Sequence, residues 1–128
     1  MEFTTRERKV IQSRINNHRQ YDKQRFGTNA TTLTYVDFLE LYIEQKGKCY
    51  WSDKQMSIES NQLADASLDR LDNDKPHTKE NCILVMRALN LGRNDATLAE
   101  WVEYLSFMGL LSEANEIEYQ QYLKNNKE

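Results

Sequence analysis

The chain has 128 residues and a net charge of −3, with 39% apolar and 29% charged residues, which favours one folded domain over a disordered segment. Two cysteines are too few for a disulfide framework or a four-cysteine zinc site, and no apolar run approaches the roughly 18 residues of a membrane span. The first residues lack the basic-then-apolar order of a secretory signal, so we expect a cytoplasmic protein that is not secreted.

Charge is unevenly distributed along the chain. Residues 1–26 contain seven basic and three acidic residues, a net charge of +4, whereas residues 96–128 contain two basic and six acidic residues, a net charge of −4. A basic arm can contact phosphate groups even when the whole protein is acidic. A solvated helix face explains the same pattern, so the charges alone leave both interpretations open.

The N-terminal segment is predicted to form a basic helix over residues 1–26. The pattern Thr4-x-x-Glu7 is a capping box, which marks the start of a helix. The apolar stripe of this helix is thin, so it is expected to lie across the body of the protein or on a ligand. The stripe consists of Val10, Ile11, Ile15 and Tyr21.

A second helix is predicted over residues 34–47. Thr34 is a suitable N-cap, and Gly47 suits the left-handed conformation that often follows a helix. Residues 49–66 have no clear period and are predicted to form a loop with one or two short strands.

Residues 66–95 are predicted to form a hairpin followed by a helix. Residues 67–71 alternate between polar and apolar side chains, residues 72–76 are rich in turn formers, and residues 82–85 form a second apolar run. A short helix is expected from residue 86 to about residue 91, where Gly92 follows. This order of elements predicts an α+β fold.

The C-terminal part is predicted to be helical over residues 97–123. Thr97-x-x-Glu100 is another capping box. The whole chain, residues 1–128, is thus predicted to be a single domain that is mainly helical.

Asp69, near the end of the first predicted strand, and Asn90, on the following helix, can face one another in such a fold. Carboxylate and amide oxygens are hard ligands that suit Mg²⁺ or Mn²⁺, with water and substrate in the remaining positions. The alternative is a surface loop in which aspartate and asparagine only form turns. Spacing alone does not separate the two.

Four pieces of this region combine into a more specific pattern. Ser-Leu-Asp-Arg-Leu-Asp-Asn at 67–73, His-Thr-Lys-Glu-Asn at 77–81, Ile-Leu-Val at 83–85 and Asn90 together resemble the HNH (His-Me finger) endonucleases, in particular a phage and large-virus branch similar to endonuclease VII. The resemblance covers roughly residues 14–105. It implies a ββα-metal fold, one divalent ion (Mg²⁺ or Mn²⁺) and hydrolysis of DNA phosphodiester bonds.

Site residues follow from the resemblance by position. Asp69 and Asn90 would hold the metal, and Asn81 would brace the hairpin loop. Arg70 occupies the place of the usual histidine base; a guanidinium cannot accept a proton near neutral pH, so it would clamp a phosphate instead. His77 would either supply the missing base or be an exposed turn residue. The residues expected to contact the DNA backbone are Arg70, Lys75, Lys79, Arg87 and Arg93.

Many relatives stabilise this fold with two CxxC pairs that bind zinc. The corresponding positions here hold Cys49, Ser52, Met86 and Leu89, so only one thiolate is left. We therefore expect no structural zinc and an apolar contact in its place.

The sequence thus predicts a metal-dependent DNA endonuclease, with branched or nicked DNA among its candidate substrates and a homodimer as an open option. A nucleic-acid-binding module that has lost catalysis is the first alternative. An interaction domain that assembles through its oppositely charged ends is the second.

Overall fold

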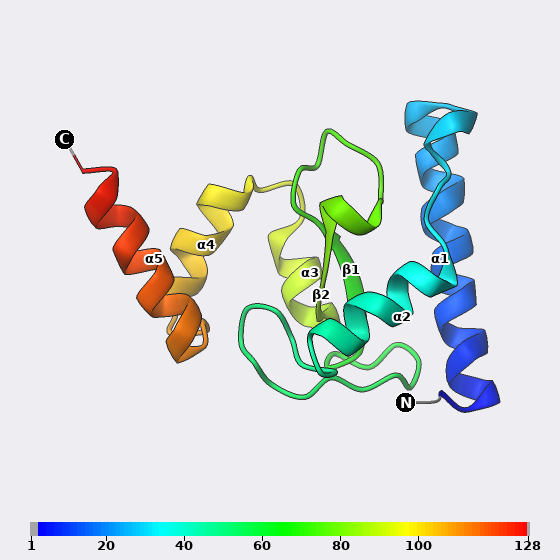
Figure 1. Ribbon diagram of the computed structural model, residues 1–128, viewed down its shortest axis with the longest axis horizontal. Coiled ribbons are helices and arrows are strands. Elements are labelled where there is room, and N and C mark those ends of the chain that lie inside the picture. The colour runs from blue at the N-terminus through cyan, green and yellow to red at the C-terminus, as the bar shows by residue number, and fades with distance from the viewer. Residues whose placement is uncertain (1–2, 128) are drawn as a thin grey trace.

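The computed structural model describes residues 3–127 and has an α+β architecture, in agreement with the predicted fold class. A two-stranded antiparallel sheet lies at the centre, with α1 and α2 on one side and α4 and α5 on the other (Figure 1). The α-helices and strands are α1 (Thr5–Phe26), α2 (Tyr35–Glu44), β1 (Ala66–Arg70), β2 (Cys82–Met86), α3 (Arg87–Arg93), α4 (Leu98–Phe107) and α5 (Glu113–Asn125). Two short 3₁₀ turns complete the list, η1 (Thr28–Ala30) and η2 (Lys79–Asn81).

Capping boxes start α1, α2 and α4 where the sequence predicts them. In α1, for example, the Thr4 hydroxyl accepts from the Glu7 amide at 3.0 Å while the Glu7 carboxylate accepts from the Thr4 amide at 2.8 Å. Such reciprocal bonds satisfy backbone donors that the first helical turn leaves without partners.

Helix α2 ends at Glu44, earlier than the predicted limit of residue 47. Lys46 and Gly47 both adopt positive φ angles, 56° and 72°, which are incompatible with a continuing right-handed helix. A side chain at Gly47 would collide with Gln55 and Tyr42, because its Cβ would lie 2.7 Å and 2.8 Å from their nearest atoms. Glycine is therefore required here both by conformation and by space.

The hairpin pairs Ala66 with Met86 at one end and Arg70 with Cys82 at the other. The segment before it, residues 49–65, contains only isolated bridges, Lys48 with Gln55 and Ser57 with Asp65. The one or two short strands predicted there are thus reduced to single pairs, because the backbone bonds of this segment are divided among its own turns and several other elements.

Helix α3 follows β2 without an intervening loop and continues through Gly92 to Arg93. Gly92 is therefore not a helix breaker. The Trp101 ring of α4 lies only 3.1 Å from the position that a Cβ on Gly92 would occupy. Glycine at this position allows α4 to pack closely against α3.

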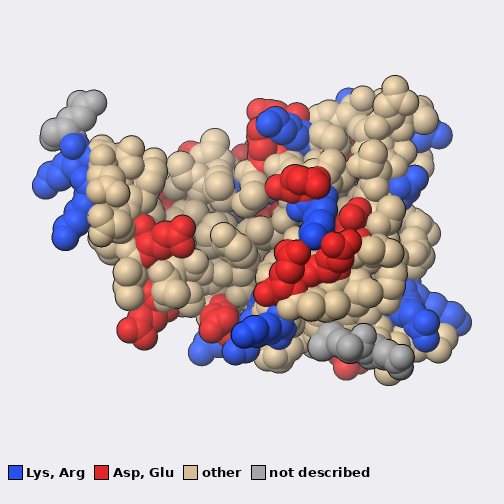
Figure 2. Space-filling view, in the orientation of Figure 1, with Lys and Arg blue, Asp and Glu red and all other residues tan. Residues whose placement is uncertain are grey.

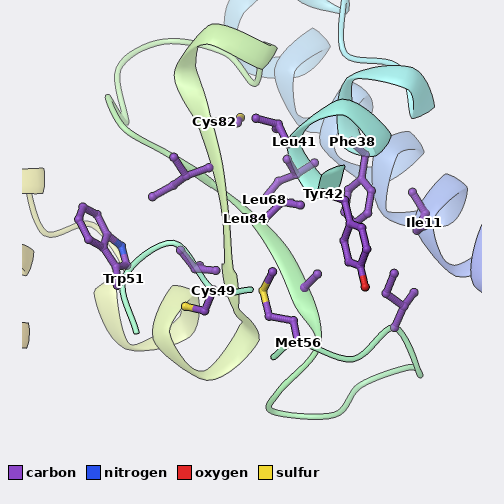
Figure 3. Packing of buried hydrophobic residues seen from close by; sticks show 14 of the residues in the cluster. Ile11, Phe38, Leu41, Tyr42, Cys49, Trp51, Met56, Leu68, Cys82 and Leu84 are labelled. Carbon is purple, nitrogen blue, oxygen red and sulfur yellow. The ribbon is translucent and has the colours of Figure 1, made fainter. Parts of the chain in front are cut away.

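The hydrophobic core lies between the hairpin and the helices α1, α2 and α4 (Figure 3). Ile11 of α1 and Phe38 and Tyr42 of α2 pack on one side of the sheet, while Leu84 is completely buried in it. The last helix, α5, buries none of its residues. No helix among residues 3–127 is both long and apolar enough to cross a membrane.

Asp65, directly before β1, organises the preceding loop. Its carboxylate is fully buried and accepts from the Ser57 hydroxyl at 2.6 Å, from the Glu59 and Gln62 amides at 3.0 Å and 3.1 Å, and from Arg14 of α1 at 3.0 Å. Despite burial, which raises the pKa of Asp65, these hydrogen bonds lower it to about 2. Asp65 therefore ties the loop, the start of β1 and α1 together.

Replacement of this carboxylate should destabilise the fold. Asp65→Ala leaves several buried donors without an acceptor, and we expect a loss of about 3–5 kcal/mol in the free energy of unfolding, measured by urea titration at pH 7. Asp95→Ala, at an exposed position, is the control and should change it by less than about 0.5 kcal/mol. Equal effects of the two substitutions would contradict the role given to Asp65.

Candidate functional site

Asp69 lies near the end of β1 and faces α3. Its side chain is 4% exposed, and Oδ1 accepts from Nη1 of Arg93 at 2.9 Å. Oδ2 is buried and has no hydrogen-bond partner among the described residues. Burial raises the pKa of Asp69, and the adjacent Arg93 guanidinium opposes that rise. An unpartnered buried carboxylate oxygen is costly, so it calls for an explanation.

Arg93 is buried beneath this site rather than on the surface. Its guanidinium donates to Asp69, to the carbonyl oxygens of Arg70 and Leu71, and, through Nε, to the carbonyl oxygen of Ala96 at 3.0 Å. The side chain is 1% exposed and makes four hydrogen bonds within the protein. A contact between Arg93 and a nucleic-acid backbone, expected from the sequence, does not fit this position.

Asn90 lies one helical turn before Arg93 and faces the same strand. Its amide nitrogen donates to the Ser67 hydroxyl at 2.7 Å and to the Leu68 carbonyl at 3.1 Å. Because the nitrogen is held by β1, the amide oxygen is left without a hydrogen bond to the described residues. The structure thus places Asp69 and Asn90 on the same contact between β1 and α3.

Asp69 and Asn90 offer part of the ligand set that a divalent cation needs. They provide one unpartnered carboxylate oxygen and one amide oxygen, both hard ligands, and Mg²⁺ is commonly bound by one or two carboxylates together with water and phosphate oxygens. No group of three or more histidine, cysteine, aspartate or glutamate side chains that could hold a metal occurs within residues 3–127. Asp69 and Asn90 therefore supply at most two of the oxygen ligands that Mg²⁺ or Mn²⁺ would need, with the others left to water and substrate.

A cleft of about 210 Å³, here named the α1–α3 cleft, opens beside Asn90. No acidic residue lines it, and two arginines do. Its lining consists of Arg14, Asn17, His18, Asn61, Ser67, Arg87, Asn90 and Leu91. Two cationic and several amide and hydroxyl groups in one small cleft are suited to an anion of the size of a phosphodiester.

Arg70 is engaged by the neighbouring helix and loop. Its guanidinium lies 5.1 Å from the centre of the Tyr21 ring of α1 and donates to the carbonyl oxygens of Asn73 and Lys75 at 2.9 Å and 3.2 Å. It is partly exposed. Both carbonyl bonds use Nη1, while Nη2 makes a long contact of 3.4 Å with the Tyr21 hydroxyl, so these contacts hold the hairpin loop against α1.

Asn81 links the two ends of the hairpin loop. Its side chain accepts from the Asp72 amide at 3.0 Å and donates to the carbonyl oxygens of Asp72 and Pro76 at 3.0 Å and 3.1 Å. The central asparagine of the resemblance therefore makes hydrogen bonds across the loop.

The lysines expected to contact DNA lie away from the cleft. Lys79 forms ion pairs with Glu40 and Glu44 of α2 at 2.9 Å and 3.0 Å, and Lys75 lies 3.9 Å from Asp72 in the loop. Acidic and basic side chains are interleaved across the middle of the face drawn in Figure 2, so this face has no continuous basic surface. Of the predicted backbone contacts, Arg87 alone lines the α1–α3 cleft.

His77 is buried, 5% exposed, and so is not the exposed turn residue of one alternative. Its backbone amide and its Nδ1 both lie 2.9 Å from the carboxylate of Asp22, which is itself fully buried in α1. Its ring centre lies 4.2 Å from that of His18. Burial lowers the pKa of His77, although the Asp22 carboxylate acts in the opposite sense.

Sequence reasoning singled out neither His18 nor Asp22. Arg14, His18 and Asp22 are spaced by four residues, which places them on one face of α1. This polar periodicity could have indicated His18 and Asp22 as site residues, but it does not reveal that the face points into the protein.

The positions aligned by the resemblance with zinc ligands lie partly in the core. Cys49 is 2% exposed, and its Sγ lies 3.4 Å from the Met86 amide nitrogen, which donates to it. Cys82, the other cysteine, is a buried strand residue whose pKa is raised to about 12 by burial. The absence of structural zinc stays a prediction, which elemental analysis of the purified protein tests.

No family model gives a significant match to this chain, and neither does any curated protein or solved structure.

Removal of Arg93 should be severely destabilising. Arg93→Ala leaves the Asp69 carboxylate buried without its counter-ion, and we expect a loss of about 3–5 kcal/mol in unfolding free energy. The double variant Asp69→Asn/Arg93→Met removes both charges and should recover a large part of that loss. Urea unfolding at pH 7 measures both, with Lys75→Ala as an exposed control. A stable Arg93→Ala protein would contradict the importance of the ion pair.

Acid should destabilise the fold through His18. Burial, followed by the charges of His77, Arg70 and Arg14, lowers the pKa of His18 from 6.5 to about 3. Between these values the unfolded imidazole binds a proton that the folded one does not, so the free energy of unfolding falls as the pH decreases from 6.5 toward 3. His18→Gln should flatten this dependence and leave the slope above pH 7.5 unchanged. An identical slope in both proteins would show that His18 titrates normally.

Proposed function

We propose that the chain is a divalent-metal-dependent nuclease of the HNH type that its sequence resembles, and that it hydrolyses phosphodiester bonds of DNA. Two observations carry the proposal. The buried Oδ2 of Asp69 has no hydrogen-bond partner among the described residues, and Asn90, which binds the same strand through Ser67 and Leu68, lines a cleft with two arginines and no acidic residue. A divalent cation would give this oxygen a partner, and a phosphate in the cleft would be a partner for Arg87, whereas Arg14 is already paired with Asp65 at 3.0 Å.

In this proposal Asp69 and Asn90 would bind the metal ion, and the arginines of the cleft would bind the substrate. Arg93 occupies Oδ1 of Asp69, so only Oδ2 is available as a ligand, and Asn90 presents its amide oxygen because Ser67 and Leu68 hold its nitrogen. When bound, the ion would polarise the scissile phosphate and stabilise the charge that develops on the leaving oxygen.

Substrate phosphate would be bound by the arginines of the cleft. Arg87 makes only a long contact, 3.4 Å, with the Asn61 carbonyl, and so keeps most of its donors. Arg14 already donates to Asp65 and to the Ala66 carbonyl, which fixes its position at the edge of the cleft. A fixed arginine is favourable for binding because little side-chain entropy is lost when the anion arrives.

A specific observation also favours the second candidate, a nucleic-acid-binding module without catalysis. Asp69 is neutralised by Arg93, which weakens its attraction for a cation, and Arg70 stands where the family that the sequence resembles has a histidine base. Under this alternative the cleft binds the DNA backbone but no metal-dependent reaction follows. Homodimerisation remains a separate prediction for both candidates.

Cleavage assays separate these candidates. The parent protein should cut supercoiled, nicked or branched DNA with Mg²⁺ or Mn²⁺ and not with EDTA. Asp69→Asn removes the ligand charge and should reduce the cleavage rate roughly 10²–10³-fold, as expected when transition-state charge loses its stabilisation.

Asp72→Asn, which changes an exposed carboxylate of the neighbouring loop, is the matched control and should retain the parent rate. Urea unfolding verifies that both variants are folded. Metal-independent DNA binding without cleavage in the parent would favour the binding module, and full activity of Asp69→Asn would remove Asp69 from the site.

A further inference from the structure

Three polar side chains form a row from the interior to the α1–α3 cleft. Asp22 of α1 is fully buried at one end, His77 of the hairpin loop is in the middle, and His18 of α1 stands at the cleft. The chain contains two histidines, and His18 is the one that lines the cleft. Neither the metal ligands nor the arginines of the proposed function explain this row.

Asp22 determines the state of His77. Its carboxylate accepts a hydrogen bond from the backbone amide of His77 at 2.9 Å and also lies 2.9 Å from Nδ1 of the His77 ring. Because an ionised carboxylate only accepts hydrogen bonds, the nitrogen facing it carries the proton, and Nε2 of His77 is left unprotonated. Two bonds from one buried carboxylate also prevent rotation of the ring.

His77 in turn positions His18. The two imidazole rings are separated by 4.2 Å between centroids and inclined by 32°, so a fixed His77 limits the orientations open to His18. The Tyr21 ring lies edge-on to His77, 6.1 Å away, and covers that ring from α1. His18 is therefore held at the cleft by packing, although it makes no hydrogen bond to another described residue.

The surroundings keep His18 uncharged until an anion binds. The charged and titratable groups around it are Arg14 on α1, Arg70 on β1 and His77 on the loop, and with burial they lower the pKa of His18 to about 3. His18, Arg14 and Arg87 line the same cleft, so the negative charge of a phosphate bound there would raise the proton affinity of His18. The His18 imidazole is thus uncharged when the cleft holds no anion, and it becomes a better proton acceptor when the substrate phosphate is bound.

We propose that His18 accepts the proton of the attacking water in the reaction proposed above, and that Asp22 and His77 are positioning residues for its ring. The oxygen of water forms a bond to phosphorus while its proton passes to the unprotonated ring nitrogen of His18. The bond from phosphorus to the leaving oxygen breaks with its electron pair, and that oxygen takes a proton from solvent. His18 then releases its proton to solvent. This inference rests on the proposed nuclease function.

The test compares His18→Gln with the parent on the DNA and metal ion that the parent cleaves. We expect the cleavage rate to fall roughly 10²–10⁴-fold, the usual contribution of a positioned base. The rate of the parent should decline with acid as His18 becomes protonated, and this decline should be absent in the variant. DNA affinity, measured by fluorescence anisotropy in EDTA, should be nearly unchanged. Gln20→Ala, on the exposed side of α1, is the control.

The positioning roles of Asp22 and His77 are tested by a separate measurement. In nuclear magnetic resonance spectra the His77 Nδ1–H should be protected from exchange, and the pKa of His18 should rise when a short DNA duplex is added in EDTA. Asp22→Asn should expose the His77 proton, shift the pH profile of cleavage and lower its rate. Asp22→Glu should recover part of that rate, because it restores the carboxylate.

The outcomes are distinguishable. A parent that cleaves no DNA with any metal overturns the proposed function and this inference with it. A parent that cleaves, with a folded His18→Gln protein that cleaves equally fast and with the same pH profile, overturns this inference alone. A His18 pKa that does not change when DNA binds would likewise contradict the placement of His18 beside the phosphate.

Discussion

The candidate site depends on the buried ion pair between the Arg93 guanidinium and Asp69. The guanidinium joins the end of α3 to Asp69, to the backbone at Arg70 and Leu71, and to the turn at Ala96. An arginine can do this because its planar fork carries five donors in fixed directions, whereas a lysine would provide a single point charge. Arg93 engages Oδ1 of Asp69 and Oδ2 has no partner among the described residues, so under the proposed function Oδ2 is the atom that would bind a cation.

The face of α1 that packs against the rest of the protein carries both apolar and polar side chains. Its apolar stripe is thin, and Ile11 and Ile15 are its buried hydrophobic side chains. The remainder of its inward face is polar: Arg14 binds Asp65, and Asp22 binds His77. Long-range hydrogen bonds therefore hold α1 on the hairpin where hydrophobic packing would usually do so. The helix consequently brings His18 to the cleft, a position that a purely apolar face could not provide.

For the binding of an anion in the α1–α3 cleft, the charges that line the cleft matter more than the net charge of the protein. The protein carries a net charge of −3, and Lys79 is neutralised by two glutamates of α2. The α1–α3 cleft nevertheless has arginines and no acidic residue in its lining. Because exposed charges are screened over about 8 Å in physiological salt, a phosphate in the cleft would respond mainly to nearby groups, which are Arg87 and the Arg14–Asp65 pair.

Sequence alone determined the elements that depend on local chemistry. The capping boxes at Thr4, Thr34 and Thr97 and the alternating strand before the turn are short-range patterns, and each element lies where its pattern predicts. Tertiary structure decided what those patterns cannot express: that Arg93 points inward, that Gly92 is a contact point for Trp101, and that His77 meets Asp22 across 55 residues of chain. An isolated sequence lists charged and polar side chains without their partners. Only the packing of α1 and α3 against the hairpin determines which of them are neutralised in the interior and which remain free in a cleft.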